Sequence, residues 1–284
     1  MKADSYFKRK SRKILKSVLA YVVLLLACLI VLLPFTIVVS TSFKTDQDAN
    51  QFPFQFIPEI FSVDAYIEVF SNGRVWLGLI NTLIIVLPIM FAGVFMSALA
   101  AFAFAKLQFK GKKTIFSLLL GSMMLPGVIT MTPAYVLYDA IGWTDSWAPL
   151  MVPGLFGTAS CIFFLRNYLV RVPDALIDAG KMAGLSMFGI FRKIVLPIIK
   201  PALVAQVILW FFAGYNDYFG PMLYLSTENN FNLQLVLKNM ITQYETRPTV
   251  MMASCVFALI PALAIYGFAQ KSLITGISLQ GVKK

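Results

Sequence analysis

Long apolar runs separated by short polar segments make up most of the chain. Six of these runs approach or exceed the ~20 residues that a helix needs to cross a bilayer. The first run ends in Ser-Thr-Ser-Phe-Lys and is longer than the apolar region of a cleaved signal peptide, so we expect it to remain as an anchor. The runs cover residues 17–40, 77–105, 114–138, 148–165, 198–225 and 249–269. This pattern predicts an all-α integral membrane protein with about six transmembrane helices, forming a single domain over residues 1–284.

The second run carries a regular series of small side chains. Gly93, Ser97, Ala101 and Ala105 recur every four residues. This spacing places them on one helix face, where another helix can approach closely. We interpret the series as a packing surface.

The composition excludes an ordinary soluble protein. Hydrophobic residues make up 59% of the 284 residues and charged residues only 13%, whereas a soluble domain has about 25% charged residues. The three cysteines, Cys28, Cys161 and Cys255, lie in separate apolar runs. They therefore predict neither a disulfide framework nor a metal site.

The basic residues lie mainly on one side of the predicted path. Of the 24 Lys and Arg residues, 20 fall in residues 1–16, 106–113, 166–200 and 270–284, which share one side if the chain crosses six times. Nine of the 13 acidic residues lie on the other side. The positive-inside rule then predicts that both termini are cytoplasmic in a multi-pass protein of the cell membrane. The basic segments lack the interleaved aromatic residues of a nucleic-acid platform, so no nucleic-acid partner is expected.

The sequence also lacks the usual residues of an ATP-hydrolysing enzyme. It contains no histidine and no Gly-x-x-x-x-Gly-Lys-Ser/Thr loop to hold ATP phosphates. We therefore expect that the chain is not an enzyme and binds no cofactor itself.

The cytoplasmic segment 166–197 predicts two short helices joined by a bend. Pro173 fits the first turn of a helix, and Asp174 and Asp178 follow near the N-terminus, where the helix dipole favours negative charge. Gly184 can end this helix. A second amphipathic stretch, residues 187–195, leads into the next apolar run.

This segment resembles the EAA loop of the permease subunits of binding-protein-dependent ABC importers. The family's Glu-Ala-Ala-x-x-x-Gly aligns with residues 178–184, with Asp178 in place of Glu, Gly180 in place of the second Ala, and Ala183 where relatives tend to carry Asp. The resemblance implies a coupling loop that docks into a cleft on the ATP-hydrolysing subunit. Its aligned residues here are Asp178, Ala179, Gly180, Gly184, Leu196 and Pro197.

Other stretches extend the resemblance over nearly the whole chain. They include residues 40–44, Asn81-Thr82, residues 103–111 and Leu125-Pro126, and the tail 276–283 is similar to the family's closing Gly-Leu-Thr-x-Gly-x-Val-Lys. The resemblance favours the sugar branch of the family, in which the chain is similar to the smaller membrane subunit of the maltose permease. It implies the type I ABC importer permease fold.

The same resemblance implies a set of partners. These are a second homologous permease subunit, two ATPase subunits that hold ATP and Mg²⁺, an extracellular or periplasmic solute-binding protein, and the surrounding lipid. The tail, with Gly276 and Gly281, would contact the ATPase subunits.

A polar group within the fifth run marks a candidate substrate path. It comprises Tyr215, Asn216, Asp217 and Tyr218. Burying an amide and a carboxylate at membrane depth is costly unless they face a cavity or a partner. They could therefore bind sugar hydroxyls beside aromatic surfaces, or instead bind neighbouring backbone opened by Gly214, Gly220 and Pro221.

Two other functions fit parts of the pattern. A permease of the same architecture could carry polyamine, phosphate or peptide. An ion-coupled secondary transporter is disfavoured, because Asp217 is the only acidic residue well inside a run and no internal repeat is visible.

Overall fold

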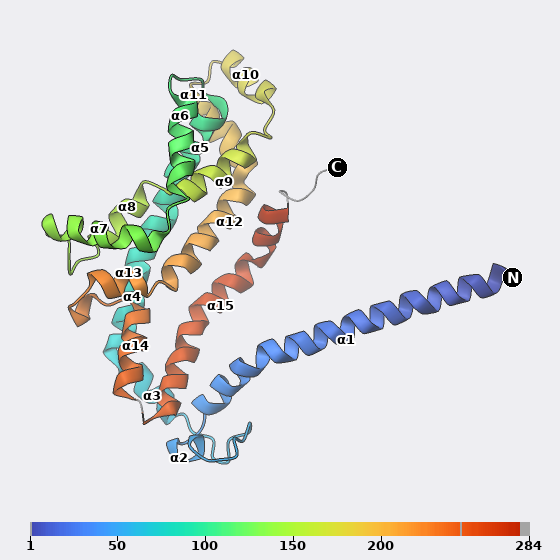
Figure 1. Cartoon of the computed structure of the whole chain (residues 1–284), viewed down its shortest axis with the longest axis vertical. Helices are drawn as coiled ribbons and strands as arrows, with labels where there is room; N and C mark the ends of the chain where they lie inside the picture. The colour runs from blue at the N-terminus through green and yellow to red at the C-terminus, as the bar shows by residue number, and fades with distance from the viewer. Residues whose placement is uncertain (1, 245, 279–284) are drawn as a thin grey trace. The chain divides into compact units, whose positions relative to one another are not determined.

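The computed structural model describes residues 2–244 and 246–278, with side chains for 14–244 and 246–270. Every regular element in these ranges is helical (Figure 1). The elements are α1 (Lys2–Ser42), α2 (Asp46–Ala49), α3 (Asp64–Ser71), α4 (Gly73–Pro88), η1 (Ile89–Gly93), α5 (Val94–Lys106), α6 (Lys112–Ser122), α7 (Gly127–Ala140), α8 (Ala148–Leu155), α9 (Ala159–Leu169), α10 (Asp174–Met182), α11 (Met187–Ile190), η2 (Phe191–Val195), α12 (Leu196–Tyr215), α13 (Phe219–Tyr224), η3 (Glu228–Asn230), α14 (Leu233–Gln243) and α15 (Pro248–Ser278).

Within the described residues, five helices are long and apolar enough to cross a membrane, and a bent pair makes up to six. The five are Ile14–Ser42, Gly73–Lys106, Ala148–Leu169, Met187–Tyr215 and Pro248–Gln270. The bent pair is α6 and α7, which meet at 98°. The run 114–138, expected as one of six membrane spans, is therefore a bent pair of helices and not one straight helix. Pro126 explains the break, because the residue before a proline is disfavoured in helical conformation.

The fifth run also differs from its expected form. The helix that reaches Tyr215 starts at Met187 and includes a π turn, η2. The short helix predicted over residues 187–195 is therefore not short, since it continues into the membrane span. The same span was expected to run to residue 225, but it ends at Tyr215, and α13 follows after a break. Pro197 is the second residue of α12, two positions after the π turn, where the first turn of a helix tolerates a missing N–H.

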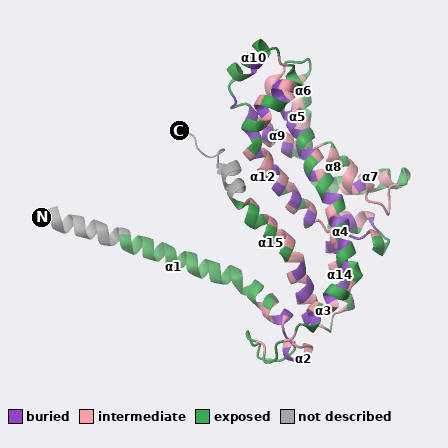
Figure 2. Cartoon of the chain, turned by 180° about the vertical axis from the view of Figure 1, so that it is seen from behind, coloured by how far each residue is buried: buried purple, intermediate pink, exposed green. Residues whose placement is uncertain are grey.

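The chain divides into two compact units. The first unit comprises Met1–Ser71 with Met240–Phe257, and the core unit comprises Asn72–Asn239 with Ala258–Lys284. In the first unit, residues 14–36 of α1 are exposed (Figure 2). Between α1 and α4, this unit also contains the short helices α2 and α3.

An ion-pair cluster joins the two parts of the first unit. The Arg247 guanidinium lies 2.8 Å from a carboxylate oxygen of Asp46 through Nε and 2.7 Å from one of Glu68 through Nη1. The Thr249 hydroxyl donates a hydrogen bond to the Asp46 carboxylate. Together these bonds hold the pKa of the Asp46 carboxyl below its usual value, although burial opposes that shift. The start of α15 is thus fastened to α2 and α3 within this unit.

The core unit is built around closely packed helices α5, α9 and α12 (Figure 1). The expected small-residue face does lie in this packing, because Ser97 and Ala101 are fully buried. Gly93 is the tightest point. A Cβ added there would lie 2.3 Å from the Gly154 carbonyl oxygen and 2.5 Å from the Trp210 ring. Only glycine fits this approach of two backbones.

Candidate functional site

The bend after α10 forms at Gly184, the residue predicted to end this helix. Gly184 has a φ of +76°, a left-handed conformation that favours glycine. The Gly184 N–H donates to the Lys181 carbonyl, and the Leu185 N–H donates to the Gly180 carbonyl. These bonds satisfy carbonyls at the helix end that would otherwise lack partners. The chain therefore turns back sharply between α10 and α11.

The two faces of α10 have different environments. Ile177 and Gly180 are buried, whereas Asp178 and Ala179 are exposed and Met182 is 90% exposed. A Cβ at position 180 would lie 2.8 Å from Ile190. The departure from the family's second alanine thus has a physical reason, because this contact leaves no room for a methyl group.

Lys106 ties α10 to the end of α5. Its Nζ donates to the Val172 carbonyl at 2.5 Å and to the Asp174 carboxylate at 2.6 Å. The hydrogen bond and the charge of Lys106 lower the pKa of Asp174. The Lys106 side chain is only 5% exposed, so its ammonium group uses these partners to replace water. Leu196 and Pro197 lie further on, in the first turn of α12, where Leu196 packs against the hydrophobic core and Pro197 is exposed.

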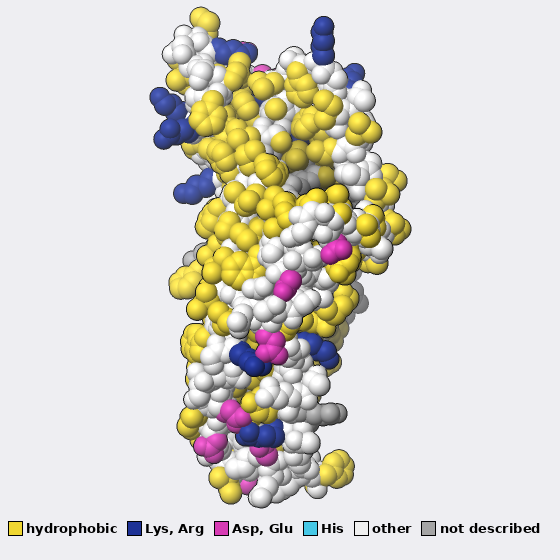
Figure 3. Space-filling model, turned by 90° about the vertical axis from the view of Figure 1, so that its left-hand side faces the viewer, with side chains coloured by type: hydrophobic (Ala, Val, Ile, Leu, Met, Phe, Trp, Pro, Cys, Tyr) yellow, Lys and Arg dark blue, Asp and Glu magenta, His cyan; other side chains and the backbone are white. Residues whose placement is uncertain are grey.

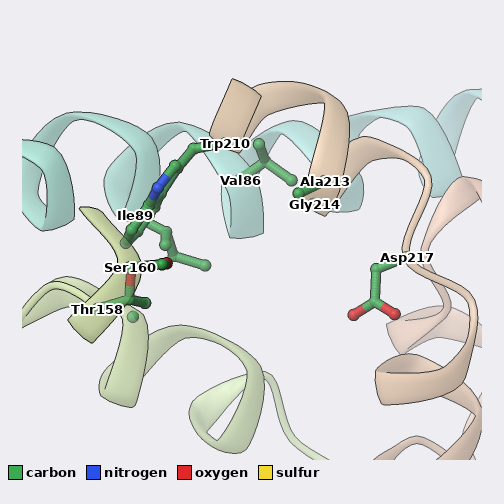
Figure 4. Close-up of a pocket in the computed structure, with 9 residues that line it drawn as sticks. Val86, Ile89, Thr158, Ser160, Trp210, Ala213, Gly214 and Asp217 are labelled. Atoms are coloured by element: carbon green, nitrogen blue, oxygen red, sulfur yellow. The ribbon is translucent and has the colours of Figure 1, made fainter. Parts of the chain in front are cut away.

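A second candidate region is a pocket of about 380 Å³ in the core unit (Figure 4). Apolar residues form most of its wall, with hydroxyl groups and a carboxylate among them. Thr158 and Ser160 place their hydroxyl oxygens 3.1 Å apart. Figure 4 shows the Asp217 carboxylate across the open space from Trp210 and Ser160. The lining residues are Val86, Ile89, Gly154, Thr158, Ser160, Trp210, Ala213, Gly214 and Asp217.

Of the four polar residues at 215–218, only Asp217 lines this pocket. Tyr215 is buried, and its hydroxyl donates to the Ala258 carbonyl at 2.8 Å. Asn216 is exposed, and its amide donates to the Phe212 carbonyl. Tyr218 is half-buried outside the lining. The candidate path therefore has one residue in the pocket and three around it.

At this helix break, amide side chains donate hydrogen bonds to two backbone carbonyl groups. Asn232 donates to the Asp217 carbonyl at 2.7 Å, and Gln234 donates to the Tyr215 carbonyl at 3.2 Å. One oxygen of the Asp217 carboxylate accepts the Gly220 N–H. Non-helical backbone is tolerated at membrane depth when it is satisfied in this way.

The sequence analysis missed Trp210, Thr158 and Ser160. A signal for Trp210 is present, because it precedes Gly214 by four residues, a spacing that returns to the same helix face. Ala213 lies between them and also lines the pocket. No comparable signal links α9 to α12, since their contact depends on the fold.

The remaining candidate residues lie near the C-terminus. The helix α15 continues to Ser278, so Gly276 belongs to this helix and not to a separate tail. Gly281 lies outside the described residues. Among the described residues, no group of three His, Cys, Asp or Glu side chains could hold a metal ion.

Comparisons with known proteins place the chain among transport proteins. No protein-family model matches it. It is 30% identical over 227 residues to the arabinooligosaccharides transport system permease protein of Bacillus subtilis (strain 168), covering 80% of each chain. It is 28% identical over 280 residues to a polygalacturonan/rhamnogalacturonan transport system permease protein of the same organism, covering 93% of this chain and 97% of that protein. A crystal structure of a bacterial ABC transporter involved in import of the acidic polysaccharide alginate has the same fold, with a TM-score of 0.82 at 23% identity over 90% of this chain and 95% of that one.

Proposed function

This chain belongs to the permease subunits of sugar ABC importers, and we propose that, with a second permease subunit, it forms the membrane path for a neutral sugar or oligosaccharide. The observation that carries the proposal is the 30% identity over 80% of the chain to a permease named for arabino-oligosaccharides. The protein is therefore a multi-pass membrane protein with the importer permease fold.

Two ATPase subunits would supply the energy. They would hold ATP and Mg²⁺, and an external binding protein would deliver the solute to the opposite face. In this orientation both termini are cytoplasmic, as the distribution of basic residues supports. A cysteine at exposed Lys110 should resist a membrane-impermeant thiol reagent in intact cells, whereas one at exposed Asn229 should react. Labelling of Lys110→Cys from outside would contradict this orientation.

The exposed face of α10 is suited to dock on an ATPase subunit. Met182 and Leu176 present apolar side chains to solvent beside Ala179 and Asp178. Such side chains are common anchors in protein interfaces. Gly184, Leu196 and Pro197 would shape the loop rather than touch the ATPase, and the C-terminal residues Gly276 and Gly281 would add a second contact.

A single helix connects the docking segment to the pocket. The described helix Met187–Tyr215 has 29 residues, or about 43 Å at 1.5 Å per residue. Its first turn packs against Gly180 through Ile190, and its last turns contribute Trp210 and Gly214 to the pocket. A displacement of α10 by the ATPase subunits would therefore reach the pocket through one rigid element.

The pocket has the chemical groups that sugars require. Its volume of about 380 Å³ lies within the usual range for small-molecule sites, about 300–1,000 Å³. The indole of Trp210 offers an apolar face, and Thr158, Ser160 and Asp217 offer hydrogen-bonding groups. Among the residues that the structure describes, no Lys or Arg lines the pocket, which favours a neutral sugar over an acidic one.

Uptake competition across a series of sugars tests this assignment. Ser160→Ala should change the rate for the preferred sugar about three- to tenfold, the effect of one hydrogen bond of about 0.5–1.5 kcal/mol. Asp217→Asn should change preference among related sugars, because it exchanges an acceptor for a donor. Ser122→Ala, a control at an exposed serine outside the pocket, should leave uptake unchanged.

Thermal unfolding of the purified complex separates binding from structure. Unchanged sugar preference together with a lowered melting temperature in both pocket variants would contradict the substrate assignment. Transport of a polyamine that is lost in Asp217→Asn would replace sugar with a cationic solute.

A further inference from the structure

A second and larger hollow, about 750 Å³, lies between the end of α5, the start of α6 and α9. It is separate from the pocket around Trp210, and the proposed sugar path does not use it. Its wall combines aromatic rings, hydroxyl groups and cationic side chains. The lining residues are Phe104, Gln108, Phe109, Gly111, Lys112, Lys113, Thr114, Phe116, Ser117 and Arg166.

The positive charge of the side chains that line this hollow is not balanced by a described carboxylate in the same lining. Three cationic side chains, Lys112, Lys113 and Arg166, line it, and no Asp or Glu is among the described lining residues. The Arg166 guanidinium lies over the Phe116 ring at 4.3 Å, and its Nε is buried without a hydrogen-bond partner among the described residues. Nearby Lys106, in contrast, has Asp174 as its partner. A buried donor without a partner is costly, and a ligand that accepts a hydrogen bond from this Nε would remove the cost.

The start of α6 adds further groups that favour an anion. The N–H groups of Lys113 and Thr114 lie in the first helical turn, where no earlier helical carbonyl can accept them. The dipole of this 11-residue helix places partial positive charge at the same end. The hydroxyl groups of Thr114 and Ser117 also line the hollow. A phosphate group matches this combination of donors.

The surface beside the hollow is apolar. On α6, Ile115 and Leu118 are exposed, the latter to 70%. Aromatic rings form the inner wall, with Phe104 in contact with Phe109 and Phe116. Figure 3 shows that hydrophobic side chains cover much of the face on this side, with Lys and Arg side chains toward its upper end. An occupant therefore needs a charged head and an apolar body.

We propose that this hollow binds the phosphate-bearing headgroup of an anionic phospholipid from the cytoplasmic leaflet. The headgroup phosphate would contact Arg166, Lys113 and the first turn of α6, while the acyl chains would lie along Ile115 and Leu118. Basic pockets between helices on the cytoplasmic side are suited to such headgroups. The proposal rests on the proposed orientation, which puts the start of α6 in the cytoplasmic half of the membrane.

Retention of phospholipid by the purified complex tests the proposal. Native mass spectrometry would compare phosphatidylglycerol with phosphatidylcholine in the wild type and in Arg166→Gln/Lys113→Gln. Removing two basic groups should weaken phosphatidylglycerol retention about thirtyfold and leave phosphatidylcholine unaffected. The single variant Lys113→Gln, at an exposed side chain, keeps the test valid if the double variant folds poorly. Lys193→Gln removes an exposed charge outside the hollow and should retain lipid as the wild type does.

Three outcomes would overturn the proposal. Equal phosphatidylglycerol retention in the wild type and the double variant would exclude the site. Equal protection of the complex against heat by inorganic phosphate and by phosphatidylglycerol would indicate a site for free anions. Loss of ATPase co-purification with unchanged lipid retention would make the hollow a subunit contact. Sugar preference and thiol labelling are measured separately, so failure of the proposed transport function or orientation is recognised independently.

Discussion

The two ends of the helix Met187–Tyr215 are held in place by different forces. At its start, apolar packing dominates, and Ile190 and Phe191 are fully buried against α5, α9 and α10. At its end, amide side chains bind backbone carbonyls, as Asn232 and Gln234 do at Asp217 and Tyr215. Packed apolar surfaces resist compression and transmit displacement. Directed hydrogen bonds instead allow a helix to stop inside a membrane protein without leaving its carbonyls unsatisfied.

The polar end extends into the loop that follows α13. Asn81 on α4 donates to the carbonyls of Asn229 and Phe231 at 2.8 and 2.9 Å. Thr82 accepts the Leu233 N–H at 2.8 Å. One helix thus fixes the backbone of a segment about 150 residues further along the chain. We therefore expect the start of the helix to convey motion and its end to hold the shape of the pocket.

The largest expected effect is at the packed end. Gly180→Leu would force a side chain against Ile190, where even a Cβ lies at 2.8 Å. We expect a loss of about 3 kcal/mol in the free energy of unfolding, with sugar-stimulated ATP hydrolysis abolished. The measurements are thermal unfolding and ATPase activity of the complex.

The neighbouring position provides the matched control. Ala179 is exposed, so Ala179→Trp should leave the melting temperature unchanged and reduce co-purification of the ATPase subunit. If the two substitutions had equal effects on stability, the assignment of a buried and a docking face on α10 would be wrong.

The next effect is at the hydrogen-bonded end. Asn81→Ala would remove two hydrogen bonds to backbone carbonyls, each with a net contribution of about 0.5–1.5 kcal/mol. We expect about 1–3 kcal/mol less free energy of unfolding, measured by denaturation of the purified complex. Exposed Asn50, which donates to the Asp46 carbonyl, is the control, and Asn50→Ala should cost little. A wild-type melting temperature for Asn81→Ala would show that packing alone holds this loop.

The smallest effect concerns Asp145, in the loop between α7 and α8. Its carboxylate accepts hydrogen bonds from the Thr227 hydroxyl and from the N–H groups of Thr227 and Ser226, which lower its pKa to about 2. Because the pKa of Asp145 is lower in the folded than in the unfolded state, its carboxylate stabilises the fold at pH values above the ordinary aspartate pKa. This stabilisation is lost as the pH falls through about 2.

Hydrogen exchange of the Thr227 amide would follow this change. Asp145→Asn should speed exchange about threefold to tenfold at neutral pH, and the wild type should approach the variant as the pH falls from about 4 to about 2. A constant difference between the two proteins over this range would exclude the carboxylate as the cause.

The sequence predicted the parts of the fold that depend on local pattern. Apolar length identified the membrane helices, and the bend at Gly184 followed from the residue type and its position. The break between α6 and α7 and the end of the fifth span at Tyr215 were missed. Hydropathy does not register a break whose residues are themselves apolar, and the satisfaction of the Tyr215 carbonyl by Gln234 is a long-range contact.

The candidate sites divide in the same way. Residues 178–184 could be placed from their motif, but the exposure of Ala179 and the burial of Gly180 required the position of Ile190. Asp217 was identified as a polar residue in an apolar run. Its neighbours Thr158 and Ser160 come from another helix, and a single sequence carries no signal for that pairing.

The π turn η1 sets a constraint on how this sequence can evolve. It joins α4 to α5 and holds one more residue than an α-helical turn. If the same number of residues formed a regular α-helix, α5 would be rotated by about 100° relative to α4. Ser97 and Ala101 would then turn away from α9, although every side chain of α5 would be unchanged. Losing one residue together with the π turn would instead keep this face toward α9, so related chains should either keep both the extra residue and the π turn or lack both.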